Sequence, residues 1–209
     1  ARLFEETQTI LAETSSLYQA SRRINEANDL QEIIAAIAEV ESASEINRLM
    51  VEVFERDPAG EVETLVVAAN WHSGQGTSPP PVGTRFRMTK IPYLDLLLSS
   101  EPIFFDDVLH DERLGLEAMT LIQQSSTQAM AILPLWVGTR QLGDLIIEIE
   151  KVHHFTERER RIYTSLAGQT AVAVENQRLL AETQAVLAEM EATQRRFTIQ
   201  AWEAYRSKK

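Results

Sequence analysis

The sequence predicts an α/β (α+β) domain built from antiparallel β-hairpins and held between two long helices. Apolar residues alternate with a period of two over residues 45–71, and two further apolar, strand-like segments lie within 127–150. No proline occurs after residue 156, so a long helix can occupy the C-terminal part. With 209 residues, the chain can hold one domain of about 150 residues and additional helix.

Residues 1–28 are expected to form an N-terminal signalling helix. Apolar residues recur there at intervals of seven, which forms an apolar seam along one helix face and favours pairing with a second helix. The seam residues are Leu3, Ile10, Leu11 and Leu17. Small polar residues such as Thr7 and Thr14 interrupt the seam, so we expect it to pair helices with moderate strength.

The central part of the chain alternates between strand and helix signals. Asp29 and Glu32 have the spacing of a capping box, which marks the start of a helix. A loop is predicted over 72–83 because this stretch holds three glycines and three consecutive prolines. The other predicted elements are a helix over 30–40, strands over 45–56 and 61–71, a short helix over 92–100, a strand over 102–106, a helix over 115–126, and strands over 127–137 and 141–150.

A helix of about 50 residues is predicted to begin after Thr156, which forms a second capping-box pattern with Glu159. It would extend roughly 75 Å at 1.5 Å per residue, so part of it must project or pair with a partner. The apolar residues of its outer part continue the seven-residue pattern at Leu180, Leu187, Met190 and Phe197. Asn176 and Thr183 are polar interruptions of this seam.

An internal repeat links the two ends of the chain. Residues 2–13 align with residues 178–189, and eight of the twelve positions are identical. Helical heptads resemble one another, which is one explanation. The alternative is that the entry and exit helices are the same element of a tandem array, in which the exit helix of one domain is the entry helix of the next.

The order of elements and several local motifs resemble the GAF domain family over about residues 25–180. The motifs are Pro81-Val82-Gly83-Thr84-Arg85-Phe86, Glu101-Pro102-Ile103-Phe104-Phe105-Asp106-Asp107-Val108, Asp111-Glu112-Arg113-Leu114, Ala131-Ile132-Leu133-Pro134-Leu135, Leu142-Gly143-Asp144-Leu145 and Phe155-Thr156-Glu157-Arg158-Glu159.

The resemblance implies an antiparallel sheet of five or six strands with helices on both faces. The first and last helices would pack on one face, and short helices and loops would enclose a small-molecule pocket on the other. The expected division is a signalling helix over 1–28, a GAF-like sensory domain over 29–180, and a projecting coiled-coil helix over 181–209.

A pocket in the usual family position would be lined by apolar side chains. The candidates are Phe86, Ile103, Phe105, Leu114, Met119, Ile122, Ile132 and Trp136. The same side chains can equally fill the core, and we favour the core. The identity of a ligand does not follow from the sequence.

Composition and missing motifs argue against catalysis and against a cofactor. The chain has no cysteine, so thiol nucleophiles, thiolate metal sites, covalent bilin attachment and thiol-based reduction of methionine sulfoxide are excluded. The residue set of the cyclic-nucleotide-binding members is incomplete. The histidines lie in loops, and the adjacent His153 and His154 should point to opposite sides, so we expect no metal or haem site. Asp107 is expected to accept backbone hydrogen bonds at a strand end rather than to act as an acid or base.

Charge and hydropathy narrow the set of partners. A formal charge of −11 with dispersed basic doublets argues against binding nucleic acid. The longest apolar run, 129–137, is far shorter than the roughly 20 residues of a membrane span, and no signal-peptide pattern is present. We therefore expect a segment of a longer cytoplasmic protein without membrane contact.

The function predicted from these features is that of a non-catalytic sensory and signal-transmission domain. It would belong to a multi-domain signalling protein, such as the sensor histidine kinase of a two-component system, and form a parallel homodimer through its terminal helices. Neighbouring signalling domains of the same chain would be its other partners. Two alternatives stay open: a receptor for an unidentified small molecule, and a purely structural dimerising spacer.

Overall fold

The computed structural model describes residues 18–24, 26–27, 29–40 and 45–206. Two compact units are distinguished, Ala1–Ala173 and Val174–Lys209, and each is described separately. The predicted N-terminal seam residues lie outside the described residues; they are Leu3, Ile10, Leu11 and Leu17. None of the helices within the described ranges is both long and apolar enough to cross a lipid bilayer.

The first unit is built on a six-stranded antiparallel sheet with the strand order β3-β2-β1-β6-β5-β4. The strands are β1 (Arg48–Arg56), β2 (Val62–His72), β3 (Arg85–Arg87), β4 (Ile103–Phe105), β5 (Ala129–Val137) and β6 (Arg140–Ile149). The two central strands come from distant parts of the chain, since β1 pairs with β6 from Arg48↔Glu148 to Val53↔Gly143. The predicted fold class is confirmed.

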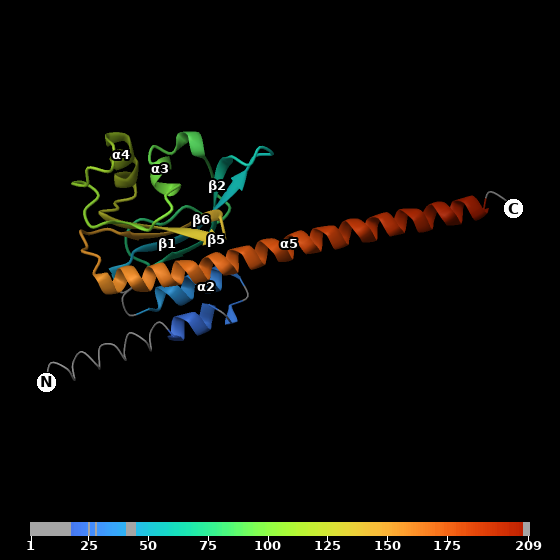
Figure 1. Cartoon of the computed structure of the whole chain (residues 1–209), viewed down its shortest axis with the longest axis horizontal. Coiled ribbons are helices and arrows are strands. Elements are labelled where there is room, and N and C mark those ends of the chain that lie inside the picture. The colour runs from blue at the N-terminus through green and yellow to red at the C-terminus, as the bar shows by residue number, and fades with distance from the viewer. Residues whose placement is uncertain (1–17, 25, 28, 41–44, 207–209) are drawn as a thin grey trace. The chain divides into compact units, whose positions relative to one another are not determined.

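Helices cover both faces of this sheet (Figure 1). One face carries α2 (Leu30–Ala38) and the part of α5 (Glu157–Arg206) that belongs to the first unit. The other face carries α3 (Leu94–Leu97) and α4 (Leu116–Gln124), with the 3₁₀ helix η2 (Met88–Lys90) following β3. The layers are those of the predicted α/β sandwich.

Strand β3 was not predicted; it directly follows the loop rich in glycine and proline. Its middle residue, Phe86, pairs with Leu65 of β2, at the edge of the sheet. The rest of the predicted loop over 72–83 has no helix or strand beyond the end of β2. Gly74 and Gly76 both have φ of +84°, a conformation that favours glycine.

Both predicted capping boxes mark helix starts. Asp29 Oδ1 accepts a hydrogen bond from the backbone N–H of Glu32 at 2.8 Å. At the start of α5 the exchange is reciprocal: Glu159 N donates to Thr156 Oγ1 at 3.2 Å, and Thr156 N donates to Glu159 Oε2 at 2.8 Å. These bonds satisfy N–H groups that the first helical turn leaves unpaired.

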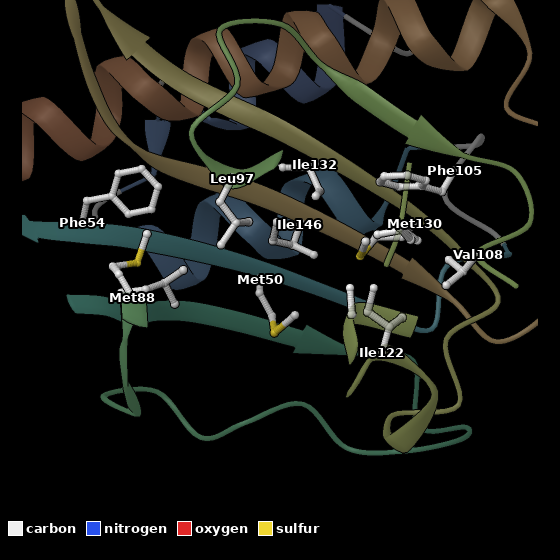
Figure 2. Close-up of a cluster of buried hydrophobic side chains, with 13 residues drawn as sticks. Met50, Phe54, Met88, Leu97, Phe105, Val108, Ile122, Met130, Ile132 and Ile146 are labelled. Carbon is white, nitrogen blue, oxygen red and sulfur yellow. The ribbon is translucent and has the colours of Figure 1, made fainter. Parts of the chain in front are cut away.

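The two faces of β1 have different chemistry. Successive side chains of a strand point to opposite faces, so Leu49 and Val51 lie on the α2 side. Met50 and Phe54 point the other way, into a buried apolar cluster that also includes Ile122 of α4 (Figure 2). Two charged residues, Arg48 and Glu52, share that second face.

Gly143 permits the close approach of the two central strands. A Cβ atom at this position would lie 1.8 Å from the backbone oxygen of Glu52. Gly168 of α5 is the natural comparison, because a Cβ atom there meets no other atom within 4 Å.

We expect Gly143→Ala to lower the free energy of unfolding by at least about 3 kcal/mol, because backbone atoms cannot move aside without breaking the β1–β6 pairing. Gly168→Ala should raise it by about 0.5–1 kcal/mol, through improved helix propensity. Urea denaturation of both variants measures the two effects. Equal stability of the two variants would contradict the described packing of β1 against β6.

Candidate ligand-binding site

A cavity of about 760 Å³ lies over the sheet face that carries α3 and α4. Its floor is formed by β1 and β6, which contribute Arg48, Met50, Glu52 and Glu148. One wall comes from the loop between β2 and β3, which contains Pro79, Pro80 and Pro81 and is called the proline loop below. The other walls come from β3 and η2, from the segment that enters α3, and from α4. The main wall residues are Thr77, Ser78, Pro79, Pro80, Pro81, Phe86, Ile91, Tyr93, Leu97, Leu121, Ile122 and Ser125.

Arg48 is a fully buried guanidinium, with 1% of its surface exposed. Its Nε donates to Glu148 Oε2 at 2.7 Å, and its two terminal nitrogens bond to Thr77 O at 2.8 Å, Ser125 O at 2.7 Å, Thr127 Oγ1 at 2.8 Å and the Glu150 carboxylate. An arginine side chain has five N–H donors, so all of them are used. Arg48 is therefore a structural cation with no donor left for a ligand.

The same network holds the proline loop against the end of β6. The backbone N–H of Thr77 donates to Glu150 Oε1 at 2.7 Å. These bonds, together with those from Arg48, hold the pKa of Glu150 below its usual value although burial alone would raise it. Gly76 fits here because a Cβ atom would lie 2.1 Å from the Glu150 carboxylate. One wall of the cavity is thus fixed by buried charge.

Glu52 differs from the fully bonded Arg48. Its carboxyl group has neither a hydrogen bond nor an ion pair with any described residue. It is 9% exposed and lines the cavity. Burial, and secondly the nearby Glu148 carboxylate, raise the pKa of Glu52 from 4.5 to about 8. At neutral pH Glu52 therefore presents a protonated carboxyl group to the cavity.

Two further acidic groups share this environment. Asp144 lies directly opposite Glu52 on β6, and burial together with Glu52 raises its pKa well above the usual value. Gln141 donates to Asp144 Oδ1 at 3.2 Å, whereas the buried Oδ2 has no partner among the described residues. Burial and the same carboxyl groups also raise the pKa of Tyr93. Proton-holding groups are therefore concentrated around Glu52, in a poorly solvated place.

Three cations line the cavity on the side of β3 and η2: Arg85, Arg87 and Lys90. All three are exposed, and Arg85 donates to Glu55 Oε1 at 2.8 Å. Charges of this kind are screened by water and salt, unlike the buried groups of the floor.

The eight predicted pocket residues occupy different places. Phe86 and Ile122 line the cavity. Phe105, Leu114 and Ile132 belong to the buried cluster of Figure 2, and Ile103 and Met119 pack against it. Trp136 is 37% exposed and lies at a separate hollow formed with the loops that connect β1 to β2 and β5 to β6. Most of the predicted apolar set is core, and the floor of the cavity is charged.

The loop residues Asp107, His153 and His154 have hydrogen-bonding partners in the structure. Asp107 Oδ1 accepts the backbone N–H of Leu109 at 3.0 Å, immediately after β4. The adjacent histidines have separate partners: His153 contacts Glu45 and Glu159, each at 2.9 Å, and His154 contacts Asp106 at 3.0 Å. Within the described ranges, no group of three or more histidine or acidic side chains is placed to hold a metal ion.

Arg48 and Glu52 were missed as site residues although β1 carries a signal for both. Arg48 and Glu52 lie four residues apart, and they alternate with the buried Met50 and Phe54 on one face of the strand. β6 carries the matching interruptions at Asp144 and Glu148. Charged residues on the apolar face of a strand are costly to bury, and this is a reason to suspect a site.

The sequence matches the family model of the GAF domain over residues 28–174, and the chain belongs to this family. No curated protein resembles the chain closely enough to count as a match.

Solved structures share the fold at low sequence identity. The GAF domain of a phosphoenolpyruvate-protein phosphotransferase from Coxiella burnetii superposes with a TM-score of 0.63 at 19% identity, covering 82% of this chain and 98% of that one. The phycocyanobilin-bound GAF domain from a cyanobacterial phytochrome gives 0.64 at 20% identity, covering 80% and 96%. A domain described as part of a two-component sensor histidine kinase from Sinorhizobium meliloti 1021 gives 0.52 at 20% identity, covering 76% and 99%.

The raised pKa of Glu52 makes the stability of the domain depend on pH. Between pH 4.5 and about 8 the native protein keeps a proton that the unfolded chain has lost, so the free energy of unfolding falls as the pH rises. The contribution of Glu52 approaches about 1.4 kcal/mol per pH unit.

We therefore expect Glu52→Gln to stabilise the domain at pH 8, with a gain that disappears towards pH 4.5. Urea denaturation at pH 5, 6, 7 and 8 measures this difference. Glu63→Gln, at an exposed position of β2, is the control and should follow the wild type. A gain in Glu52→Gln that is constant over this pH range would contradict the assigned environment.

Proposed function

We propose that this GAF domain is a non-catalytic sensory module that transmits a signal along α5 to neighbouring domains of a larger signalling protein. The supporting observation is the apolar seam of the second unit, whose large side chains are exposed to solvent in a single chain. The similarity to a domain of a sensor histidine kinase makes a two-component kinase our candidate for the larger protein. A cytoplasmic location follows from this role as part of the proposal.

The seam of the second unit consists of large apolar side chains at coiled-coil spacing. Leu180 and Leu187 occupy one heptad position, and Met190 and Phe197 occupy the other. Their exposed fractions are 59%, 55%, 64% and 68%. Leu179 and Val186 widen the stripe and are 46% and 52% exposed. An exposed stripe of this kind is typical of a surface that a partner covers.

The proposed partner is a second copy of the same helix, aligned in parallel. Two identical seams in the same register bring Leu180 against Leu180 and Leu187 against Leu187, which is the geometry that heptad spacing favours. Thr183 lies within the seam, and its hydroxyl donates to Leu179 O at 2.8 Å in its own helix. It therefore weakens the seam without leaving an unpaired polar group. A seam of moderate strength suits a helix that must change its pairing.

We expect the chain to be a dimer, with about twice the chain mass of 23.6 kDa at tens of micromolar in light scattering. The double variant Leu180→Asp/Leu187→Asp should be monomeric with an unchanged first unit, because four carboxylates would meet in the seam. Ala181→Asp/Ala188→Asp adds the same charges one position off the seam and should stay dimeric. A wild-type mass near 23.6 kDa would contradict the proposed dimer.

Transmission along the helix depends on the rotational register between neighbouring domains. Inserting seven residues after Ala185 in the larger protein restores the seam, so regulation of its output should be largely retained. Inserting three or four residues rotates the seam by about half a turn and should lock the output on or off. Output assays with the three insertions test this. Equal tolerance of all of them would identify the helix as a passive tether.

A second candidate function, a receptor for a small molecule, is favoured by the cavity. A volume of about 760 Å³ lies within the usual range of small-molecule sites. Its floor contains the unpaired Glu52, which a merely structural spacer does not require. Receptor and transmitter are compatible roles, since a ligand can bias a pairing equilibrium only through a site of this kind.

A further inference from the structure

The floor of the cavity offers a ligand one carboxyl group without a hydrogen-bond partner among the described residues. Every N–H of Arg48 is already bonded, so this cation cannot pair with Glu52. Glu148 is also engaged, by Arg48 Nε at 2.7 Å and by Thr127 Oγ1 at 3.2 Å. The carboxyl group of Glu52 lines the cavity, is nine-tenths buried and has no partner in the described part of the chain. A buried polar group of this kind is ordinarily hydrogen-bonded.

The sign of the charge that fits beside Glu52 follows from its neighbours. Glu148 and Asp144 face it from β6, and Tyr93 faces it from the segment that enters α3. An anion placed here would meet two or three carboxyl groups, whereas a cation would restore the charge of Glu52. The cations Arg85, Arg87 and Lys90 line the same cavity but are exposed.

The difference in burial decides whether the carboxyl groups of the floor or the cations at the side determine which ligand charge is favoured. An interaction at an effective dielectric constant of about 20 is about four times stronger than the same interaction in bulk water. The buried carboxyl groups therefore dominate the floor, and the exposed cations at the side are screened. Arg85 is further neutralised by Glu55.

The remaining lining favours an apolar body next to the charged group. Pro79, Pro80 and Pro81 form one wall, and Phe86 and Tyr93 add aromatic rings. Aromatic faces attract organic cations as well as apolar groups. A bare metal ion would gain nothing from this wall.

We propose that the cavity recognises a small organic cation, with an amidinium, guanidinium or ammonium group bound by Glu52 and an apolar body packed against the proline wall and the aromatic rings. This assignment rests on the receptor role proposed above and names the ligand class of that cavity.

Binding of such a cation is coupled to the release of a proton. Glu52 has to ionise to pair with the ligand, and at pH 7 only about one molecule in ten carries an ionised Glu52 when its pKa is about 8. The affinity should therefore rise about tenfold between pH 7 and pH 9.

Three probes of nearly equal shape test the charge preference: benzamidine, benzamide and benzoate. Each is titrated into the whole chain and followed by ¹H–¹⁵N NMR, at pH 7 and pH 9. We expect benzamidine to shift the amide signals of Glu52 and Tyr93 and to bind at least about tenfold more tightly than the other two at pH 9. Calorimetry of the wild type in two buffers of different ionisation enthalpy should report the released proton at pH 7.

Variants separate the role of Glu52 from general changes of the cavity. Glu52→Gln keeps the size of the side chain and should abolish both the preference for benzamidine and its pH dependence. Glu63→Gln should change neither. Should Glu52→Gln not fold, the proton release of the wild type still decides the question.

Tighter binding of benzoate or benzamide would overturn the cation assignment and leave the receptor role intact. Failure of all three probes to shift cavity signals would also overturn it. The dimer and insertion experiments report on signal transmission independently of either result.

Discussion

The hydrogen-bond network of the buried Arg48 guanidinium is the interaction on which the cavity-bearing face of the sheet depends. It begins the central strand β1 and reaches the proline loop at Thr77, the end of α4 at Ser125, Glu148 of β6, and Glu150 just after β6. Removing a guanidinium from water is costly, and the cost is met only when every donor is paired. Because all five are, Arg48 holds two separate wall segments, at Thr77 and Ser125, to one point of the sheet.

This arrangement leaves two acidic groups, Glu52 and Asp144, without a counter-charge among the described residues. Glu52 and Asp144 face one another across the two central strands, where Gly143 brings the backbones close together. A core selected for stability alone would place apolar side chains at both positions, as it does at Met50 and Ile146 between them and Arg48. Unpaired acidic groups in a cavity are common at binding sites, where local rules are broken for function.

Local signals account for the parts of the fold that could be predicted. The capping pairs Asp29–Glu32 and Thr156–Glu159 act over three residues, and the hairpins follow from alternation and turn residues, so each can be found within a short window. The site depends on contacts between residues that are far apart in the sequence, and a short stretch of sequence does not reveal them. Arg48 is 29 residues from Thr77 and 100 from Glu148, so its burial becomes evident only once β1 and β6 are paired.

Most of the apolar pocket candidates are core residues, for a related reason. Phe105 and Ile132 have the composition expected of a pocket, yet side chains of this kind are also the best core residues, and they lie in the cluster beneath the short helices. The residue that indicates the cavity best is Glu52, an acidic residue on a face of β1 that also carries buried apolar side chains. Alternation alone places Glu52 on the same face as Met50 and Phe54, which is a testable sign of a buried carboxyl group.

The unfolding free energy of Arg48→Met, compared with that of Arg48→Met/Glu148→Gln, tests the structural basis of the cavity most directly. The single change leaves Glu148 and Glu150 without their buried counter-charge and should cost about 3–5 kcal/mol. The double change removes one of these stranded charges and should recover a substantial part of the loss. A single variant within about 1 kcal/mol of the wild type, or a double variant less stable than the single one, would contradict the central role of Arg48.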